Sequence, residues 1–155
     1  MAFSFATVDP SGNTTSTATT SLTVSPVSAI ITASNFTPGS SVTGVANVSN
    51  TGTVDEFYQV TINWSPTATT TTAAATRLVK ELVVSVTAGS PSATASPVFA
   101  GSMYNLIDQP TSPGQSLTLA TGNENVQFAV NLPSSASSTY QGIDVGFDIV
   151  FVGLS

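Results

Sequence analysis

Apolar side chains recur at every second position over much of this chain, and this alternation constrains the fold more than any other feature. The clearest run closes the chain, at residues 143–151. Its apolar members are Ile143, Val145, Phe147, Ile149 and Phe151, with Asp144 and Asp148 between them. Because successive side chains of a strand point to opposite faces, such a run predicts a β-strand with one buried face.

Shorter runs of the same kind, separated by turn residues, cover the rest of the chain. Alternation occurs in VTGVANVSN, EFYQVTINW and NVQFAVNLP, and Gly, Pro and Asn mark turns near residues 37–40, 50–53, 112–114 and 121–123. The segment TRLVKEL, at residues 76–82, is the one helix that we expect. The sequence therefore predicts an all-β fold, an antiparallel β-sandwich of the jelly-roll or immunoglobulin-like kind with one short helix.

Charged residues are scarce, which excludes several classes of partner. The chain has 2 Lys and Arg residues against 8 Asp and Glu, and only 6% of its residues are charged. Two cations cannot neutralise a row of phosphates, so nucleic acid and anionic membranes are not expected partners. No apolar run reaches the roughly 20 residues of a membrane span. No signal segment precedes the first strand, as in a secreted chain whose signal has been removed or in one never exported.

Four Asn-x-Ser/Thr sequons favour export, although a chain so rich in Ser and Thr also produces such matches by chance. These candidate glycosylation sites are Asn13, Asn35, Asn47 and Asn63. We accordingly expect an extracellular protein.

The residue types of the sequence give little support for a catalytic site. The chain has no Cys and no His, which excludes Ser-His-Asp, Cys-His and HExxH sites. Asp144 and Asp148 would lie about 13 Å apart on one face of a strand, too far for a carboxylate pair that shares a proton. We interpret them as residues that keep the outer sheet face soluble, and we expect no catalytic residue and no cofactor.

A hard-cation site is the remaining chemical alternative. Asp55 and Glu56 are adjacent acids at the foot of a strand, and Asp9 or Asp108 could join them around Ca²⁺. No EF-hand-like spacing supports this, so we interpret the pair as a solvated hairpin end and expect no metal ligand.

The N-terminal segment raises the question of its partner. MAFSFATVD alternates like a strand but is separated from the remainder by the polar DPSGNTTSTATT. We interpret it as a donor strand that enters the sheet of another copy; its residues are Met1, Ala2, Phe3, Ser4, Phe5, Ala6, Thr7 and Val8. An ordinary first strand within its own domain and a frayed terminus are the alternatives. Burial of two Phe and a Met, worth roughly 1.5 to 3 kcal/mol each, favours insertion.

This interpretation divides the chain into a donor strand (1–9), a flexible linker (10–20) and a β-sandwich domain (21–155). The linker could extend to roughly 40 Å at about 3.3 Å per residue. We expect the acceptor groove to be lined by Phe128, Val130, Phe147, Ile149 and Phe151. Since each copy would give one strand and receive one, head-to-tail exchange would produce a filament whose partner is the chain itself.

The order of several motifs resembles the TasA/camelysin family of secreted fibre proteins, and most of all the archaeal bundling pilins. The most telling motifs are F-x-P-G (Phe36, Pro38 and Gly39), N-T-G-T at residues 50–53 and Y-Q-G at residues 140–142. They stand in order with SLTV, LVKELVVSV and GSMYNLID. The resemblance implies a jelly-roll subunit that polymerises by donor-strand complementation, with residues 1–8 as the donor. Some relatives are labelled metalloproteases, an activity that a chain without His does not inherit.

A second hypothesis is a monomeric binding module, either an adhesin or a carbohydrate-binding domain. Trp64, Tyr58 or Tyr104 would then form an aromatic platform for a sugar. The shared face of Tyr58 and Trp64 on one predicted strand favours a core role for both.

Overall fold

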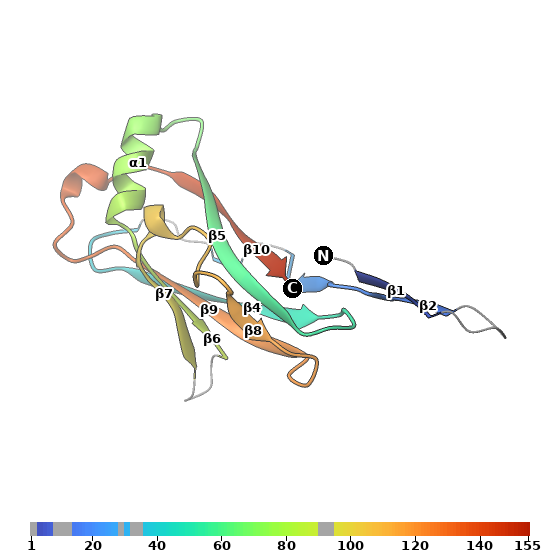
Figure 1. The fold of residues 1–155 in the computed structure, drawn as a ribbon. Coiled ribbons are helices and arrows are strands. Elements are labelled where there is room, and N and C mark those ends of the chain that lie inside the picture. Colours follow the sequence, from blue (N-terminus) through green and yellow to red (C-terminus); the bar gives the residue numbers. More distant parts are fainter. Residues whose placement is uncertain (1–2, 8–13, 28–29, 32–35, 90–94) are drawn as a thin grey trace.

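Two antiparallel sheets packed face to face form the body of the protein (Figure 1). The computed structural model describes residues 3–7, 14–27, 30–31, 36–89 and 95–155, with the backbone alone for 3–7 and 14–17. The predicted all-β antiparallel sandwich with one short helix is confirmed. Between the sheets lies an aliphatic and aromatic core that includes Val48, Val84 and Phe128.

The larger sheet has five strands in the order β3-β4-β9-β6-β7. Their bounds are β3 Leu22–Ser25, β4 Ser41–Asn50, β9 Asn123–Asn131, β6 Val83–Ala88 and β7 Ser96–Ser102. In β4 and β9 every second side chain is buried, as the alternation predicts. The edge strand β3 is short and pairs only with residues 47–50 of β4, so it leaves the first half of β4 without a described neighbour on that side.

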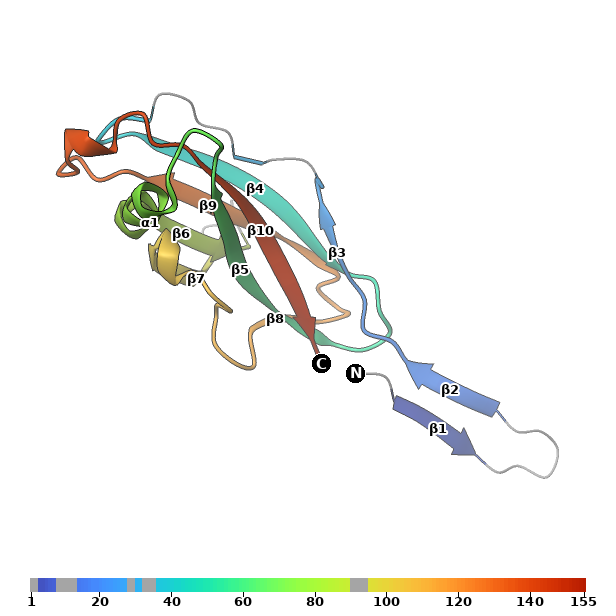
Figure 2. The same cartoon turned by 90° about the horizontal axis from the view of Figure 1, so that it is seen from above.

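The smaller sheet has three strands in the order β10-β5-β8. Its strands are β5 Glu56–Pro66, β8 Gln115–Leu117 and β10 Val145–Leu154. β10 pairs with β5 over its whole length, from Val145 opposite Pro66 to Leu154 opposite Phe57. This long ladder, whose one charged residue is Asp148, runs the length of the sandwich (Figure 2).

One helix, α1 Thr72–Glu81, connects the two sheets at one end of the sandwich. It begins four residues before the predicted start because Thr71 caps it, accepting the Ala74 N–H on its side chain (3.3 Å). Ala75, Leu78 and Val79 face the core. Two short 3₁₀ turns, η1 Met103–Asn105 and η2 Ser138–Tyr140, complete this end, which we call the helix end.

The first strand joins neither sheet of the sandwich. β1 Phe3–Thr7 pairs with β2 Thr14–Ala18 in a separate two-stranded sheet, with Phe3 opposite Ala18 and Phe5 opposite Ser16. Figures 1 and 2 show this hairpin projecting beyond the sandwich at the end where β10 finishes, which we call the exit end. Part of the segment expected to be a flexible linker is therefore strand β2.

Candidate functional site

The candidate site is the outer edge of β10. Among the described residues β10 pairs with β5 alone. The Val60 N–H donates to the Gln109 carbonyl (2.7 Å) and the Val60 carbonyl accepts from the Gln109 N–H (2.9 Å), so the Val60 peptide groups point away from β10. In an antiparallel ladder this orientation alternates along both strands. Phe151, opposite Val60, therefore directs its own N–H and carbonyl to the open edge.

The same orientation extends along β10. Ile62 donates to the Leu106 carbonyl (3.0 Å), so Ile149, opposite Ile62, also faces the open edge with its peptide groups. By alternation Phe147 does the same. The side chains of these three residues point into the sandwich. The edge thus offers a row of hydrogen-bonding groups directly above apolar side chains, which is the arrangement that an added strand requires.

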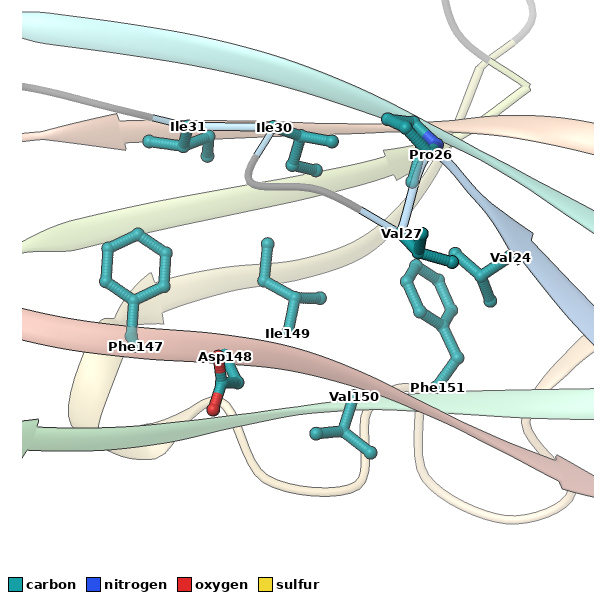
Figure 3. Close-up of a pocket in the computed structure, with 11 residues that line it drawn as sticks. Val24, Pro26, Val27, Ile30, Ile31, Phe147, Asp148, Ile149, Val150 and Phe151 are labelled. Atoms are coloured by element: carbon teal, nitrogen blue, oxygen red, sulfur yellow. The ribbon is translucent and has the colours of Figure 1, made fainter.

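An apolar groove of about 450 Å³ runs beneath this edge (Figure 3). Phe147, Ile149 and Phe151 form one wall, and the opposite wall comes from Val24, Pro26, Val27, Ile30 and Ile31. Val27, at the rim, is 100% exposed. A volume of this size lies in the range of clefts that bury a ligand, so it can accept apolar side chains from an incoming segment.

The groove continues towards the helix end. A second hollow of about 610 Å³ shares Phe147 and Ile31 with the first and extends past Val130 to Tyr140 and Ile143. The two hollows together follow β10 from Val145 to Phe151, about 20 Å of strand.

The wall opposite β10 depends on a glycine in β4. Gly44 lies on the inner face of β4, and the backbone of Ile30 approaches so closely that a Cβ at this position would collide with it. Chain segment 30–31 thereby lies against the inner face of β4, beyond the point where β3 ends. The apolar segment VSAIITAS at residues 27–34 predicts a short strand from its sequence, but its described residues, 27, 30 and 31, are not in a strand.

Phe128 and Val130 lie deeper than the other predicted groove residues. Phe128 is completely buried and meets the Phe151 ring edge-on, with centroids 6.0 Å apart. Val130 is also buried and lines the second hollow only. Phe128 therefore packs in the core against the groove residue Phe151. The predicted groove residues Phe147, Ile149 and Phe151 do line the groove.

Tyr58 supports Phe151 from the β5 side. Its ring lies 5.8 Å from that of Phe151, and its hydroxyl donates to Glu124 Oε1 (2.7 Å). Burial, then the hydrogen bond to Glu124 and the charge of that carboxylate, raises the pKa of Tyr58. The phenol therefore stays protonated in the folded protein at pH values where an unfolded tyrosine ionises.

This raised pKa predicts a loss of stability in alkali. Above about pH 10 the unfolded state binds fewer protons than the folded state, so the free energy of unfolding falls by up to about 1.4 kcal/mol per pH unit. Tyr58→Phe is expected to remove this contribution while costing about 1 kcal/mol at neutral pH for the lost hydrogen bond. Urea unfolding at pH 7.5, 10 and 11 measures both. Tyr104→Phe, which alters an exposed ring, is the control, and an unchanged alkaline slope in Tyr58→Phe would contradict the assignment.

The acidic residues that the structure describes do not gather into a metal site. Among the described residues no three His, Cys, Asp or Glu side chains lie close enough to hold an ion. Asp55 is exposed and accepts the Leu119 N–H (2.8 Å), whereas Glu56 is only 1% exposed. The prediction of a solvated pair is therefore wrong for Glu56. Asp144 and Asp148 are exposed, as predicted, and Asp9 lies outside the described residues.

The aromatic residues considered for a sugar platform do not share one surface. Tyr58 is fully buried. Trp64 and Tyr104 are neighbours with centroids 6.4 Å apart, but their planes are tilted by 44°, and Lys80 Nζ lies over the Tyr104 ring at 4.9 Å. These contacts pack η1 and α1 against β5 and favour a structural role for the three residues.

The described sequons differ in accessibility. Asn47 Nδ2 donates to Asn123 Oδ1 (3.2 Å) and Asn125 Oδ1 (3.0 Å), so a glycan on Asn47 would break part of this amide cluster. Asn63 is exposed on the outer face of β5. Asn13 and Asn35 lie outside the described residues, as do Met1, Ala2 and Val8 of the expected donor strand.

Comparison with known proteins gives no family assignment. No family model matches the chain, and no curated protein matches it in sequence. In the part of the chain that the structure describes, no helix is long and apolar enough to cross a membrane.

Proposed function

We propose that this protein is the subunit of an extracellular filament, assembled head to tail by donor-strand complementation. The main support is the combination of two features in one chain. β10 has an open edge above an apolar groove, and the first strand, β1, belongs to neither sheet of its own sandwich. The resemblance to the TasA/camelysin fibre proteins, and to the archaeal bundling pilins in particular, points the same way. The donor would be residues 1–8 of a neighbouring copy.

The chemistry of the edge supports an added strand. Natural proteins protect free edges with Lys, Pro or short strands. β10 is long and contains neither Lys nor Pro, and both cations of the chain lie in α1. Such an edge invites pairing with another chain, and a donor strand would satisfy its hydrogen bonds and cover the groove below it.

The point at which the N-terminal arm (residues 1–18) leaves the sandwich predicts the direction in which the donor strand inserts into the next copy. The chain leaves the sandwich at the exit end through β2, and β1 folds back along it (Figure 2). Once the β1–β2 pairing is released to free the donor strand, the extended arm would have residue numbers that fall with distance from the exit end. In a head-to-tail filament the arm enters the next groove at the helix end of that groove. Residue 8 then lies at the entrance, and residue 1 lies farthest inside, towards the exit end. β10 runs from the helix end to the exit end. The donor strand is therefore expected to lie antiparallel to β10.

Paired cysteines test this orientation, since the chain has no native Cys. Ala2→Cys combined with Val152→Cys is expected to give a ladder of disulfide-linked oligomers under oxidising conditions, because an antiparallel donor brings these positions together on the outer face. Ala2→Cys combined with Gly146→Cys should give none. Non-reducing electrophoresis, with electron microscopy of the same samples, is the measurement.

Each other outcome has a distinct meaning. A ladder from the Gly146 pair alone would show a parallel donor and overturn the orientation. A monomer with an internal disulfide would show that the arm folds back into its own groove. Monomers without cross-links, and no filaments from the unaltered chain at any concentration or pH, would overturn the proposed function.

A further inference from the structure

The base of the N-terminal arm, residues 19–21, is fixed to the sandwich by several hydrogen bonds. The Thr53 N–H donates to the Thr19 carbonyl (2.8 Å), and the Thr19 N–H donates to Thr53 Oγ1 (2.9 Å). The Thr51 N–H donates to the Ser21 carbonyl (2.8 Å), and the Ser21 and Thr51 hydroxyls are 2.9 Å apart. Residues 19–21 are thus hydrogen-bonded along one side to the loop at residues 51–53.

Glu56 completes this attachment from inside the protein. Its Oε1 accepts the Ser21 N–H, while its Oε2 is buried without a hydrogen-bond partner among the described residues. Burial of a carboxylate with an unsatisfied oxygen costs stability. If only packing mattered at this position, a leucine would stabilise the fold more than a glutamate. The role of Glu56 is therefore sought in its hydrogen bond to the Ser21 N–H.

Gly52 makes the close approach feasible. A Cβ at this position would lie 2.7 Å from Glu56 Oε1 and 3.0 Å from the Ser21 nitrogen, and it would collide with the Thr19 carbonyl. Gly52 itself is held by its N–H, which donates to Asn50 Oδ1 (2.9 Å). The loop therefore fits residues 19–21 only without a side chain at position 52.

We infer that residues 19–21, held by the loop 51–53 and by Glu56, form an arm latch, and that Glu56 is the positioning residue that fixes the direction in which the donor strand leaves the sandwich. This inference rests on the proposed function. In a filament joined through its arms, the angle between successive subunits depends on where each arm leaves one copy and enters the next. A rigid exit gives one helical symmetry, and a loose exit gives many.

Glu56→Leu separates this role from a role in folding. Replacement of a poorly paired buried charge by an apolar side chain of similar size is often neutral or stabilising, so the midpoint of thermal unfolding is expected to hold or rise. The Ser21 amide loses its acceptor, and its hydrogen exchange should accelerate about tenfold. Filaments should still form, because the donor and the groove are intact, but without a single helical symmetry in electron micrographs.

Two further variants complete the experiment. Gly52→Ala is expected to reproduce the loss of helical order, because it displaces residues 19–21 by a steric route. Glu81→Leu removes the same charge from the end of α1 and should leave helical order and Ser21 exchange unchanged. If Glu56→Leu abolishes filaments altogether, the affinity of the folded variant for a peptide of residues 1–9 is measured. Unaltered affinity would show that the acceptor groove is intact and that the changed position of the arm prevents assembly.

The failures are distinguishable. Filaments of Glu56→Leu with the symmetry and order of the unaltered protein would overturn the latch and leave the proposed function standing. Unaltered Ser21 exchange in that variant would also overturn it. An absence of filaments from the unaltered protein would overturn the proposed function and, with it, the role of the latch in filament geometry.

Discussion

A chain that carries Phe3→Ser and Phe5→Ser together is expected to fold normally and to form no filaments. Alternation along residues 1–8 places both Phe side chains on one face of the donor, towards the acceptor groove. Burial of each is worth about 1.5 to 3 kcal/mol, so the double change should weaken subunit association by roughly two to four orders of magnitude. Negative-stain electron microscopy shows the loss directly.

The folded state should survive because β1 joins neither sheet of the sandwich. Circular dichroism and thermal unfolding of the variant should match those of the unaltered chain. Ser4→Thr combined with Ala6→Ser, which changes the opposite face of the same strand, is the matched control and should still polymerise. Filaments of normal length from the Phe double variant would contradict the donor assignment.

Ile149→Pro is expected to block assembly from the acceptor side. The Ile149 N–H points to the open edge, so proline removes no hydrogen bond within the subunit, and edge strands tolerate it there. A donor carbonyl would lose its partner on binding, at a cost of about 1 to 3 kcal/mol, or a roughly 5- to 150-fold weaker affinity. Fluorescence anisotropy of a labelled peptide of residues 1–9, with a chain that lacks those residues, measures this affinity.

Two neighbouring variants make the test specific. Ile149→Ala keeps the N–H and shortens the side chain, which separates the loss of the hydrogen bond from the loss of groove packing. Val150→Pro removes an N–H that points to β5, opposite Thr61, so it should destabilise the subunit itself. A stable Val150→Pro chain beside an unfolded Ile149→Pro chain would reverse our assignment of the open edge.

Alternation in the sequence was sufficient to predict β10 and the inward direction of Phe147, Ile149 and Phe151. It could not separate the groove from the core, because Phe128 alternates in the same way on β9. The difference arises from sheet order: β9 lies in the middle of the larger sheet and β10 at the edge of the smaller one. Strand order depends on contacts between distant segments, which no local pattern records.

Two further features had no local signal. The TTSTA segment of β2 is polar, which predicts a linker, yet it pairs with β1. Glu56 is charged and follows a turn, which ordinarily indicates a solvated position. Its burial depends on Ser21, 35 residues earlier in the chain, whose backbone N–H it accepts.

The opposite placement of the arm and of the groove entrance gives a filament built in this way two unlike tips. At one tip the last subunit keeps an empty groove, and at the other the last arm has no groove to enter. Free donor peptide would therefore terminate only the tip with the empty groove. A surface that supplies one unpaired strand would suffice to anchor that tip, so such a fibre would be asymmetric in growth and attachment even though every subunit is identical.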